Sequence, residues 1–392
     1  MKRYESLDSL RGLAALAVMV GHFFLVFPFM GQNTTSWGFI NYPINFLKYT
    51  PLHIIWAGHE AVIMFFLLSG LVLALPYTDG KKPAYGIYLV KRICRIYLPY
   101  AAAVLLAVLA KEAFFHAPLT GLSGYFNSQW TTKTTFSSLL DHATFLGNFN
   151  STVYDPILWS LIHEMRISII FPLLVLIVVK GGWKLTLPVC AALSVTAQFL
   201  LDTLQPRFMT NHVVTIHYIS FFLIGALIAK YRHELIQVYS RLSKWMIICL
   251  IGAAVLAYTN KWLFYGADWH RGTARFYLED WIIALGAVVF IWLALASPLM
   301  QKPLSSRPVL FLGRTSYSLY LYHFVVLLSF LHILRDKIPV PVILALAFGV
   351  SFAAAAAGYY GIEKPGMRLG RWLTSHRSGT TKQAVVNQST TM

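Results

Sequence analysis

Residues 7–22 read LDSLRGLAALAVMVGH, and this stretch decides how the rest of the chain is interpreted. It lies in an apolar run from about residue 8 to residue 29, which is long enough for a helix to cross the hydrocarbon core of a bilayer. The run is too long for a signal peptide, it contains Arg11 and His22, and no small-residue cleavage site follows it. We therefore expect a retained first transmembrane helix.

The composition extends this prediction to the whole chain. Of 392 residues, 57% are hydrophobic and only 12% are charged, about half of the roughly 25% usual in soluble domains. This excludes a soluble enzyme, a disordered protein and a coiled coil, and predicts an all-α, polytopic membrane helix bundle of about ten transmembrane helices. The predicted spans are roughly 8–29, 54–76, 94–114, 157–179, 185–202, 211–230, 245–260, 276–297, 316–334 and 340–361.

The formal net charge of +17 follows the predicted topology. Most of the 32 Lys and Arg fall in alternate connections, which by the positive-inside rule places both termini in the cytoplasm. The excess is therefore no sign of a nucleic-acid partner. Residues 1–365 are predicted to form one transmembrane domain and 366–392 a cytoplasmic tail that is disordered near its end. The polar connection 115–156 suits contact with sugars or headgroups, or is a plain connector.

Ionisable side chains inside spans are costly and mark candidate functional sites. On a helix, Arg11 and His22 lie about 20° apart around the axis and about 16 Å apart along it, so they share one face. Gly12 and the nearby alanines keep this helix slim enough for close packing. The alternative interpretation is an Arg that reaches the interface and a hydrogen-bonded structural His.

Arg92 and Arg95 project from one face at the cytoplasmic start of the third span. The positive-inside rule alone would explain them, but beside Arg11 they form a candidate cradle for a phosphorylated cytosolic ligand, because guanidinium groups bind phosphate bidentately. Glu164, between His163 and Arg166 in the fourth span, is expected at the depth of His22, where a carboxylate could orient the imidazole. The alternative is a salt bridge between Glu164 and Arg166 or a neighbouring helix.

The remaining polar residues give weaker signals. Glu60 follows His59 at the start of the second span, and His323 in the ninth span is read first as a polar packing residue. Among the remaining histidines, His53, His212, His217 and His270 have no metal-ligand spacing, so no metal site is predicted. Cys94, Cys190 and Cys249 give no argument for a disulfide.

Five motifs, taken in order, resemble the acyltransferase-3 family of bacterial membrane O-acyltransferases. They are LDSLRGLAALAVMVGH, FFLLSG, KRICRIYLP, LWSLIHE and TSYSLYLYH, and the resemblance covers about residues 6–365. It implies transfer of an acyl group, most often acetyl, from cytosolic acyl-CoA to a hydroxyl group of an extracytoplasmic glycan, a lipid-linked sugar or a small molecule. It also implies a multi-pass protein of the bacterial cytoplasmic (inner) membrane.

The family pattern is transferred position by position. The Arg and His separated by ten residues fall on Arg11 and His22, the Arg-x-x-Arg pair on Arg92 and Arg95, and Trp-Ser-Leu-x-x-Glu on Trp159, Ser160, Leu161 and Glu164; Ser69 lies in FFLLSG. Two positions depart from the pattern: Ile63 stands where an acid is usual, with Glu60 as its suggested substitute, and Arg166 has no family role.

These assignments predict that Arg11, Arg92 and Arg95 bind the CoA phosphates and that His22 and Glu164 are catalytic. His22 is either the general base toward the acceptor hydroxyl or the carrier of the acyl group. Glu60, Ser69, Trp159, Ser160 and His323 are predicted to support the site. The alternative functions are a transporter or flippase of a glycolipid or small metabolite, and a structural membrane protein; the oligomeric state is left open.

Overall fold

The computed structural model describes residues 4–31, 43–144, 150–204, 210–263 and 273–375. His270, part of the 115–156 connection and the end of the predicted tail lie outside these residues. Every regular element in the described ranges is a helix. The elements are α1 (Glu5–Phe24), α2 (Pro28–Gly31), α3 (Pro43–Lys48), η2 (Pro51–Trp56), α4 (Gly58–Thr78), α5 (Tyr85–Phe114), α6 (Gly124–Asn127), α7 (Phe136–Thr144), η3 (Ser151–Val153), α8 (Leu158–Leu204), α9 (Thr210–Lys230), α10 (Arg232–Tyr239), α11 (Lys244–Tyr258), α12 (Asn260–Leu263), α13 (Thr273–Ala296), α14 (Pro298–Leu304), α15 (Arg307–Leu334), α16 (Val340–Gly358) and η5 (Tyr359–Glu363).

The all-α membrane fold is confirmed. In the described part of the chain, 8 helices are long and apolar enough to cross a bilayer. The fourth and fifth predicted spans are the two halves of α8, and the seventh is the shorter α11, of 15 residues. The last helical stretch runs from Val340 to Ser375, so it includes the first residues of the predicted tail.

Gly182 divides α8 at the place where the sequence predicted a connection. Its φ of 58° lies in the left-handed region, and a Cβ there would be 2.6 Å from the Tyr231 hydroxyl. Only glycine suits such a position without strain. The Lys230 ammonium donates to the carbonyls of Val178 and Val179, both at 3.0 Å, and so satisfies the end of the first half.

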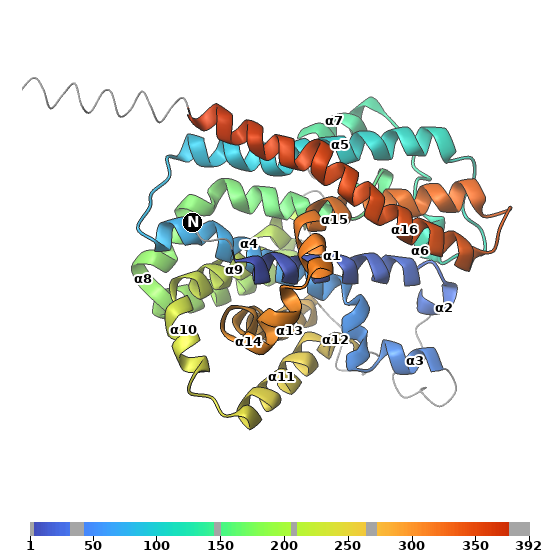
Figure 1. The fold of residues 1–392 in the computed structure, drawn as a ribbon. Helices are drawn as coiled ribbons and strands as arrows, with labels where there is room; N and C mark the ends of the chain where they lie inside the picture. Colours follow the sequence, from blue (N-terminus) through green and yellow to red (C-terminus); the bar gives the residue numbers. More distant parts are fainter. Residues whose placement is uncertain (1–3, 32–42, 145–149, 205–209, 264–272, 376–392) are drawn as a thin grey trace, which may run out of the picture.

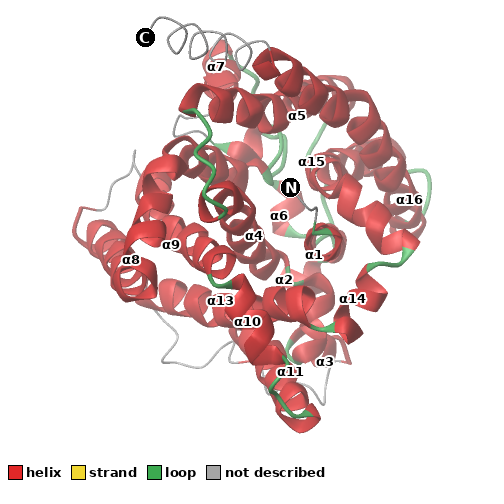
Figure 2. Cartoon of the chain, turned by 60° about the vertical axis from the view of Figure 1, so that its left-hand side comes forward, coloured by secondary structure: helices red, strands yellow, loops and turns green. Residues whose placement is uncertain are grey.

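The helices surround α1, which lies between α4 and α15 (Figure 2). The start of α1 and the end of the last helix lie at one end of the bundle, while α2, α3 and α6 lie at the other (Figure 1). Which end faces the cytoplasm is still given by the distribution of Lys and Arg. We call the end that contains the start of α1 the inner end, and the end that contains α2, α3 and α6 the outer end.

A close contact between two glycines fixes α1 against α15. A Cβ on Gly12 would lie 2.5 Å from the backbone nitrogen of Gly313, and one on Gly313 would lie 2.7 Å from the backbone of Asp8. The helices are parallel, because His22 and His323, each ten residues further on, also meet. This register carries the contact about 15 Å along both helices. The small residues noted in the first span thus set the position of its histidine.

Candidate active site

His22, in the last turn of α1, and His323, on α15, form a hydrogen-bonded pair. His22 Nδ1 lies 3.0 Å from His323 Nε2, and His323 Nδ1 lies 2.9 Å from the carbonyl oxygen of Leu319. A carbonyl only accepts, so His323 carries its proton on Nδ1 and its Nε2 accepts from His22 Nδ1. This arrangement leaves the lone pair of His22 on Nε2, the nitrogen needed for a base or a nucleophile.

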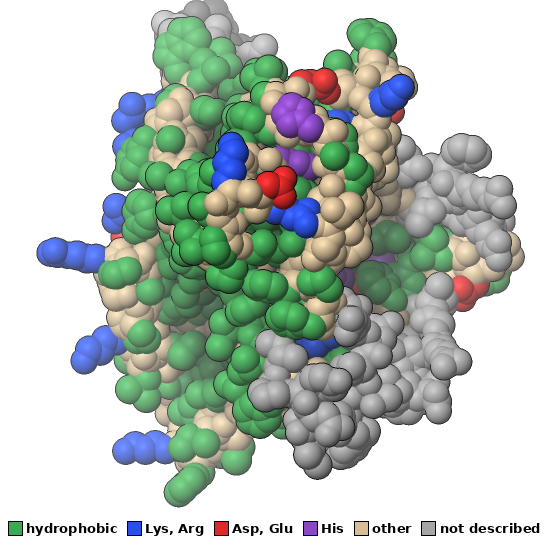
Figure 3. Space-filling view, turned by 90° about the vertical axis from the view of Figure 1, so that its right-hand side faces the viewer, with side chains coloured by type: hydrophobic (Ala, Val, Ile, Leu, Met, Phe, Trp, Pro, Cys, Tyr) green, Lys and Arg blue, Asp and Glu red, His purple; other side chains and the backbone are tan. Residues whose placement is uncertain are grey.

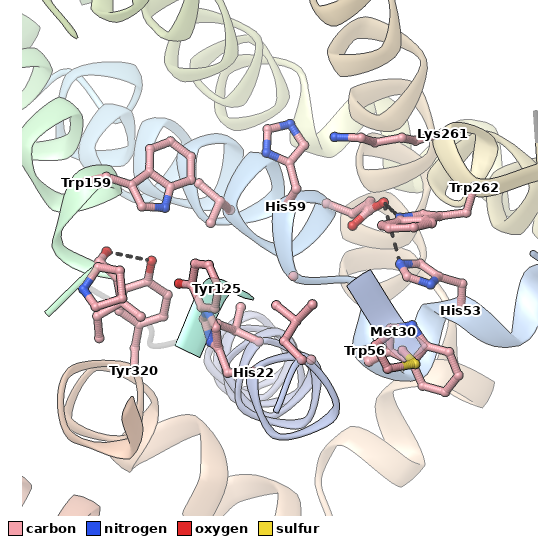
Figure 4. A pocket seen from close by; sticks show the side chains of 18 of the residues that line it. His22, Met30, His53, Trp56, His59, Tyr125, Trp159, Lys261, Trp262 and Tyr320 are labelled. Carbon is pink, nitrogen blue, oxygen red and sulfur yellow. Dashed lines mark hydrogen bonds and ion pairs between the residues drawn. The ribbon is translucent and has the colours of Figure 1, made fainter. Parts of the chain in front are cut away.

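His22 faces a cavity of about 460 Å³ near the outer end, which we call the outer cavity. The ring stacks near Tyr125 (centroids 6.4 Å apart) and packs edge-on against Phe324 (5.0 Å). Figure 4 shows His22 beside Tyr125 in this cavity. Figure 3 shows the outer end of the molecule, with a hollow among hydrophobic and histidine side chains. The polar and aromatic lining includes His22, Lys48, His53, Trp56, His59, Glu60, Tyr125, Trp159, Lys261, Trp262 and Tyr320.

A second cavity, of about 530 Å³, lies toward the inner end, and we call it the inner cavity. It contains all three predicted arginines, of which Arg92 is buried and Arg95 is exposed. Six basic side chains line it in total, namely Arg11, Arg92, Arg95, Arg314, Lys364 and Arg371, against the acidic Asp8, Glu164 and Glu363. The net positive lining suits an anionic ligand such as a group of phosphates.

Glu164 belongs to the inner cavity, and this corrects its predicted pairing with His22. Its Oε1 accepts from Ser69 Oγ at 3.0 Å and from Arg92 Nη2 at 3.2 Å. Ser69 Oγ in turn accepts from Arg11 Nη2 at 3.4 Å. The chain from residue 153 to residue 158 is already buried where α8 begins, so Glu164 lies deeper than a helix starting at the surface would place it. The partner that orients His22 is His323.

The alternative predicted for Glu164, a salt bridge with Arg166 or with a neighbouring helix, is confirmed in its second form, because Glu164 forms an ion pair with Arg92 on α5. Arg166 Nη1 contacts Thr215 Oγ1 at 3.3 Å, and the same hydroxyl lies 2.8 Å from His163 Nδ1. These two side chains therefore pack against α9. Arg92 also donates to Ser168 at 2.6 Å.

The two cavities share Val62 and Tyr320 as lining residues. The Tyr320 hydroxyl donates to the carbonyl of Ile157 at 3.1 Å and accepts from Ser160 at 2.7 Å. Phe65 packs edge-on against the Tyr320 ring at 5.6 Å. Tyr320 is thus held in the partition between the basic inner cavity and the histidine-containing outer cavity.

The other supporting residues also line a cavity. Trp159 lies in the outer cavity with its ring parallel to His59, 6.4 Å between centroids. Glu60 is 1% exposed there, accepts from Trp262 Nε1 at 3.1 Å and lies 4.0 Å from His53. Because His53 is buried near Lys261, its pKa is lowered to about 3, so the ring is neutral.

Two groups of side chains in the site were not predicted. Arg314, Lys364 and Arg371 complete the inner cavity, but in the sequence they are indistinguishable from basic residues that follow the positive-inside rule. Asp280 was passed over, although an acid inside the eighth predicted span is itself a signal. No group of three or more His, Cys, Asp or Glu in the described residues is arranged to hold a metal ion.

The spanning helices and the paired cavities define a multi-pass membrane protein with two adjoining cavities. The chain matches the acyltransferase-3 family, described as an acyltransferase domain, over residues 4–360. It therefore belongs to this family of acyltransferases, and the resemblance found in the motifs is confirmed. Comparisons with curated proteins and with solved structures found no match.

Proposed function

We propose that this protein transfers an acyl group, most simply acetyl, from cytosolic acyl-CoA to a hydroxyl group of an extracytoplasmic glycan or glycolipid. The observation that supports this best is the pair of cavities, one basic and one containing His22, separated by a thin partition. The distribution of Lys and Arg supports a cytoplasmic position for the basic cavity, and the membrane of this proposal is the bacterial inner membrane.

The inner cavity suits the donor. Arg11, Arg92 and Arg95 can pair with the phosphates of coenzyme A, and Glu164 holds the Arg92 side chain in place. The pantetheine arm would then pass Val62 and Tyr320 and present the thioester to the outer cavity. A rotation of the Tyr320 ring, or its displacement by the ligand, opens this path.

The outer cavity suits the acceptor. Several aromatic rings (Trp56, Tyr125, Trp159 and Trp262) provide flat apolar faces, and His59 and Glu60 provide polar contacts, a combination that fits a hydroxylated ring. His22 Nε2 is available there either to take the proton of the hydroxyl or to attack the thioester and carry the acyl group.

The test uses membranes from the native host with and without the gene. Membranes are incubated with [14C]acetyl-CoA, and label is measured in extracted glycans and glycolipids, with mass spectrometry to locate the ester. We expect labelling only when the gene is present. Equal labelling in both membranes would refute the proposal, and acceptor export without any acylation would favour the transporter alternative.

A further inference from the structure

A second histidine in the outer cavity is oriented by a buried carboxylate. His59, in the first turn of α4, lines this cavity, and its Nε2 lies 2.6 Å from Asp280 Oδ1 on α13. The His59 side chain is 20% exposed and that of Asp280 only 1%. A buried acid that holds an accessible imidazole is the base and orienter arrangement of general-base catalysis.

The second carboxylate oxygen of Asp280 also has a hydrogen-bond partner, His217. His217 Nε2 lies 3.3 Å from Asp280 Oδ2, and His217 Nδ1 lies 2.9 Å from Ser194 Oγ. A carboxylate only accepts, so the proton of the neutral His217 ring lies on Nε2, and His217 Nδ1 accepts from Ser194 Oγ, which itself accepts from Trp281 Nε1 at 3.1 Å. His217 therefore carries its proton on Nε2 and donates it to Asp280, which accepts two N–H groups as a carboxylate.

The same reasoning fixes the tautomer of His59. Its Nε2 proton is donated to Asp280, so the lone pair of the neutral ring lies on Nδ1. His59 and His22 occupy facing walls of the outer cavity in Figure 4. Of the three imidazoles that line the cavity, His59 and His22 are each hydrogen-bonded to a buried partner that leaves one ring nitrogen with a lone pair, namely Asp280 for His59 and His323 for His22.

We propose that the two histidines divide the reaction, with His22 as the carrier of the acyl group and His59 as the catalytic base toward the acceptor. This inference rests on the proposed function. Asp280 is then a positioning residue, because it acts through His59.

The bonds and protons balance. His22 Nε2 attacks the thioester carbon, the C–S bond breaks, and the CoA thiolate takes a proton from water on its way out. The His22 Nδ1 proton passes to His323 Nε2. The acceptor oxygen then attacks the acyl carbon, its proton moves to His59 Nδ1, and the C–N bond breaks. His323 returns its proton to His22, and His59 releases the acceptor proton to water.

The experiment separates the two half-reactions. Membranes of the host gene deletion strain carry wild type, His59→Gln, Asp280→Asn or the control His332→Gln. The control ring stacks on Trp130, 5.3 Å between centroids, and lines neither cavity. Exchange of [3H]CoA into acetyl-CoA measures acylation of the carrier, and transfer of label from [14C]acetyl-CoA to extracted glycans and glycolipids measures the complete reaction.

We expect His59→Gln to keep CoA exchange within about threefold of wild type and to lose transfer by about 100-fold or more, the usual contribution of a general base. Asp280→Asn should lose transfer by about tenfold or more with exchange retained, and His332→Gln should match wild type. Transfer by His59→Gln within tenfold of wild type, or equal loss of exchange and transfer, would overturn the assignment. If the wild-type protein transfers label to glycans or glycolipids but shows no CoA exchange, the separate roles of His22 and His59 are overturned and the proposed function stands. If the wild-type protein transfers no label at all, the proposed function is refuted.

Discussion

Replacing His323 with phenylalanine keeps a ring of similar size in α15 but removes the nitrogen that accepts from His22. His323 is 0% exposed, and its Nε2 lies 3.0 Å from His22 Nδ1. Without that acceptor the His22 ring loses the side-chain partner that fixes the tautomer with its lone pair on Nε2, and its bond with the Val18 backbone is left as its remaining contact of this kind. His323→Gln is the matched variant, because its amide oxygen can still accept.

The size of the effect follows from the lost hydrogen bond. A buried donor left without its partner costs about 1–3 kcal/mol, and each 1.4 kcal/mol corresponds to about a tenfold change. We therefore expect the His323→Phe protein to transfer the acyl group about 5- to 150-fold more slowly than wild type, and His323→Gln to recover most of the rate.

The assay is the initial rate of [14C]acetyl transfer in membranes, divided by the amount of inserted protein measured by immunoblot. Size-exclusion profiles of the purified variants in detergent report on folding. The reasoning is refuted if His323→Phe is as fast as wild type, or if the Gln and Phe variants lose the same amount of activity while both fold normally.

Three further predictions concern the donor site, the packing of α1 and the buried His53 of the outer cavity. Arg95→Gln should raise the KM for acetyl-CoA about tenfold with kcat unchanged, because Arg95 lines the inner cavity; Lys91→Gln, at the same end, is the control, and equal KM values in steady-state kinetics would contradict the cradle. Gly12→Ala should lower thermal stability by about 1–3 kcal/mol because its Cβ would overlap α15, whereas Gly349→Ala, which meets nothing within 4 Å, should not; equal melting temperatures would argue against the close contact. Burial lowers the pKa of His53 in the folded state to about 3, so between about pH 6.5 and pH 3 the unfolded chain binds a proton at this residue and the folded protein does not, and the free energy of unfolding falls by up to about 1.4 kcal/mol per pH unit. His53→Gln should therefore lose less thermal stability than wild type between pH 7 and pH 5. Parallel losses in the two proteins would refute this.

Some of the site could be predicted from local periodicity. The helical spacing that places Arg11 and His22 on one face holds, and Arg11, Arg92 and Arg95 line one cavity as the motifs suggested. These predictions need only the geometry of single helices and the rule that basic residues gather at one side of a membrane.

The pairing across helices could not be predicted, because depth along a helix does not say which neighbour faces a residue. His22 and His323 are 301 positions apart, and they meet because α1 and α15 pack in a register that includes the close contact of Gly12 with Gly313. The position of Glu164 was misjudged because α8 begins below the surface. The bridge from His59 to Asp280 joins residues 221 positions apart.

The central claim is that His22 is the point at which the acyl group leaves the donor for the acceptor. The most direct measurement is [14C]acetyl transfer from acetyl-CoA to extracted glycans and glycolipids by membranes that contain His22→Gln at the wild-type level. We expect a loss of about 10³-fold or more, typical of a nucleophile or base, with acetyl-CoA binding retained because the inner cavity is unchanged. A His22→Gln protein that inserts normally and still acylates its acceptor at the wild-type rate would contradict it.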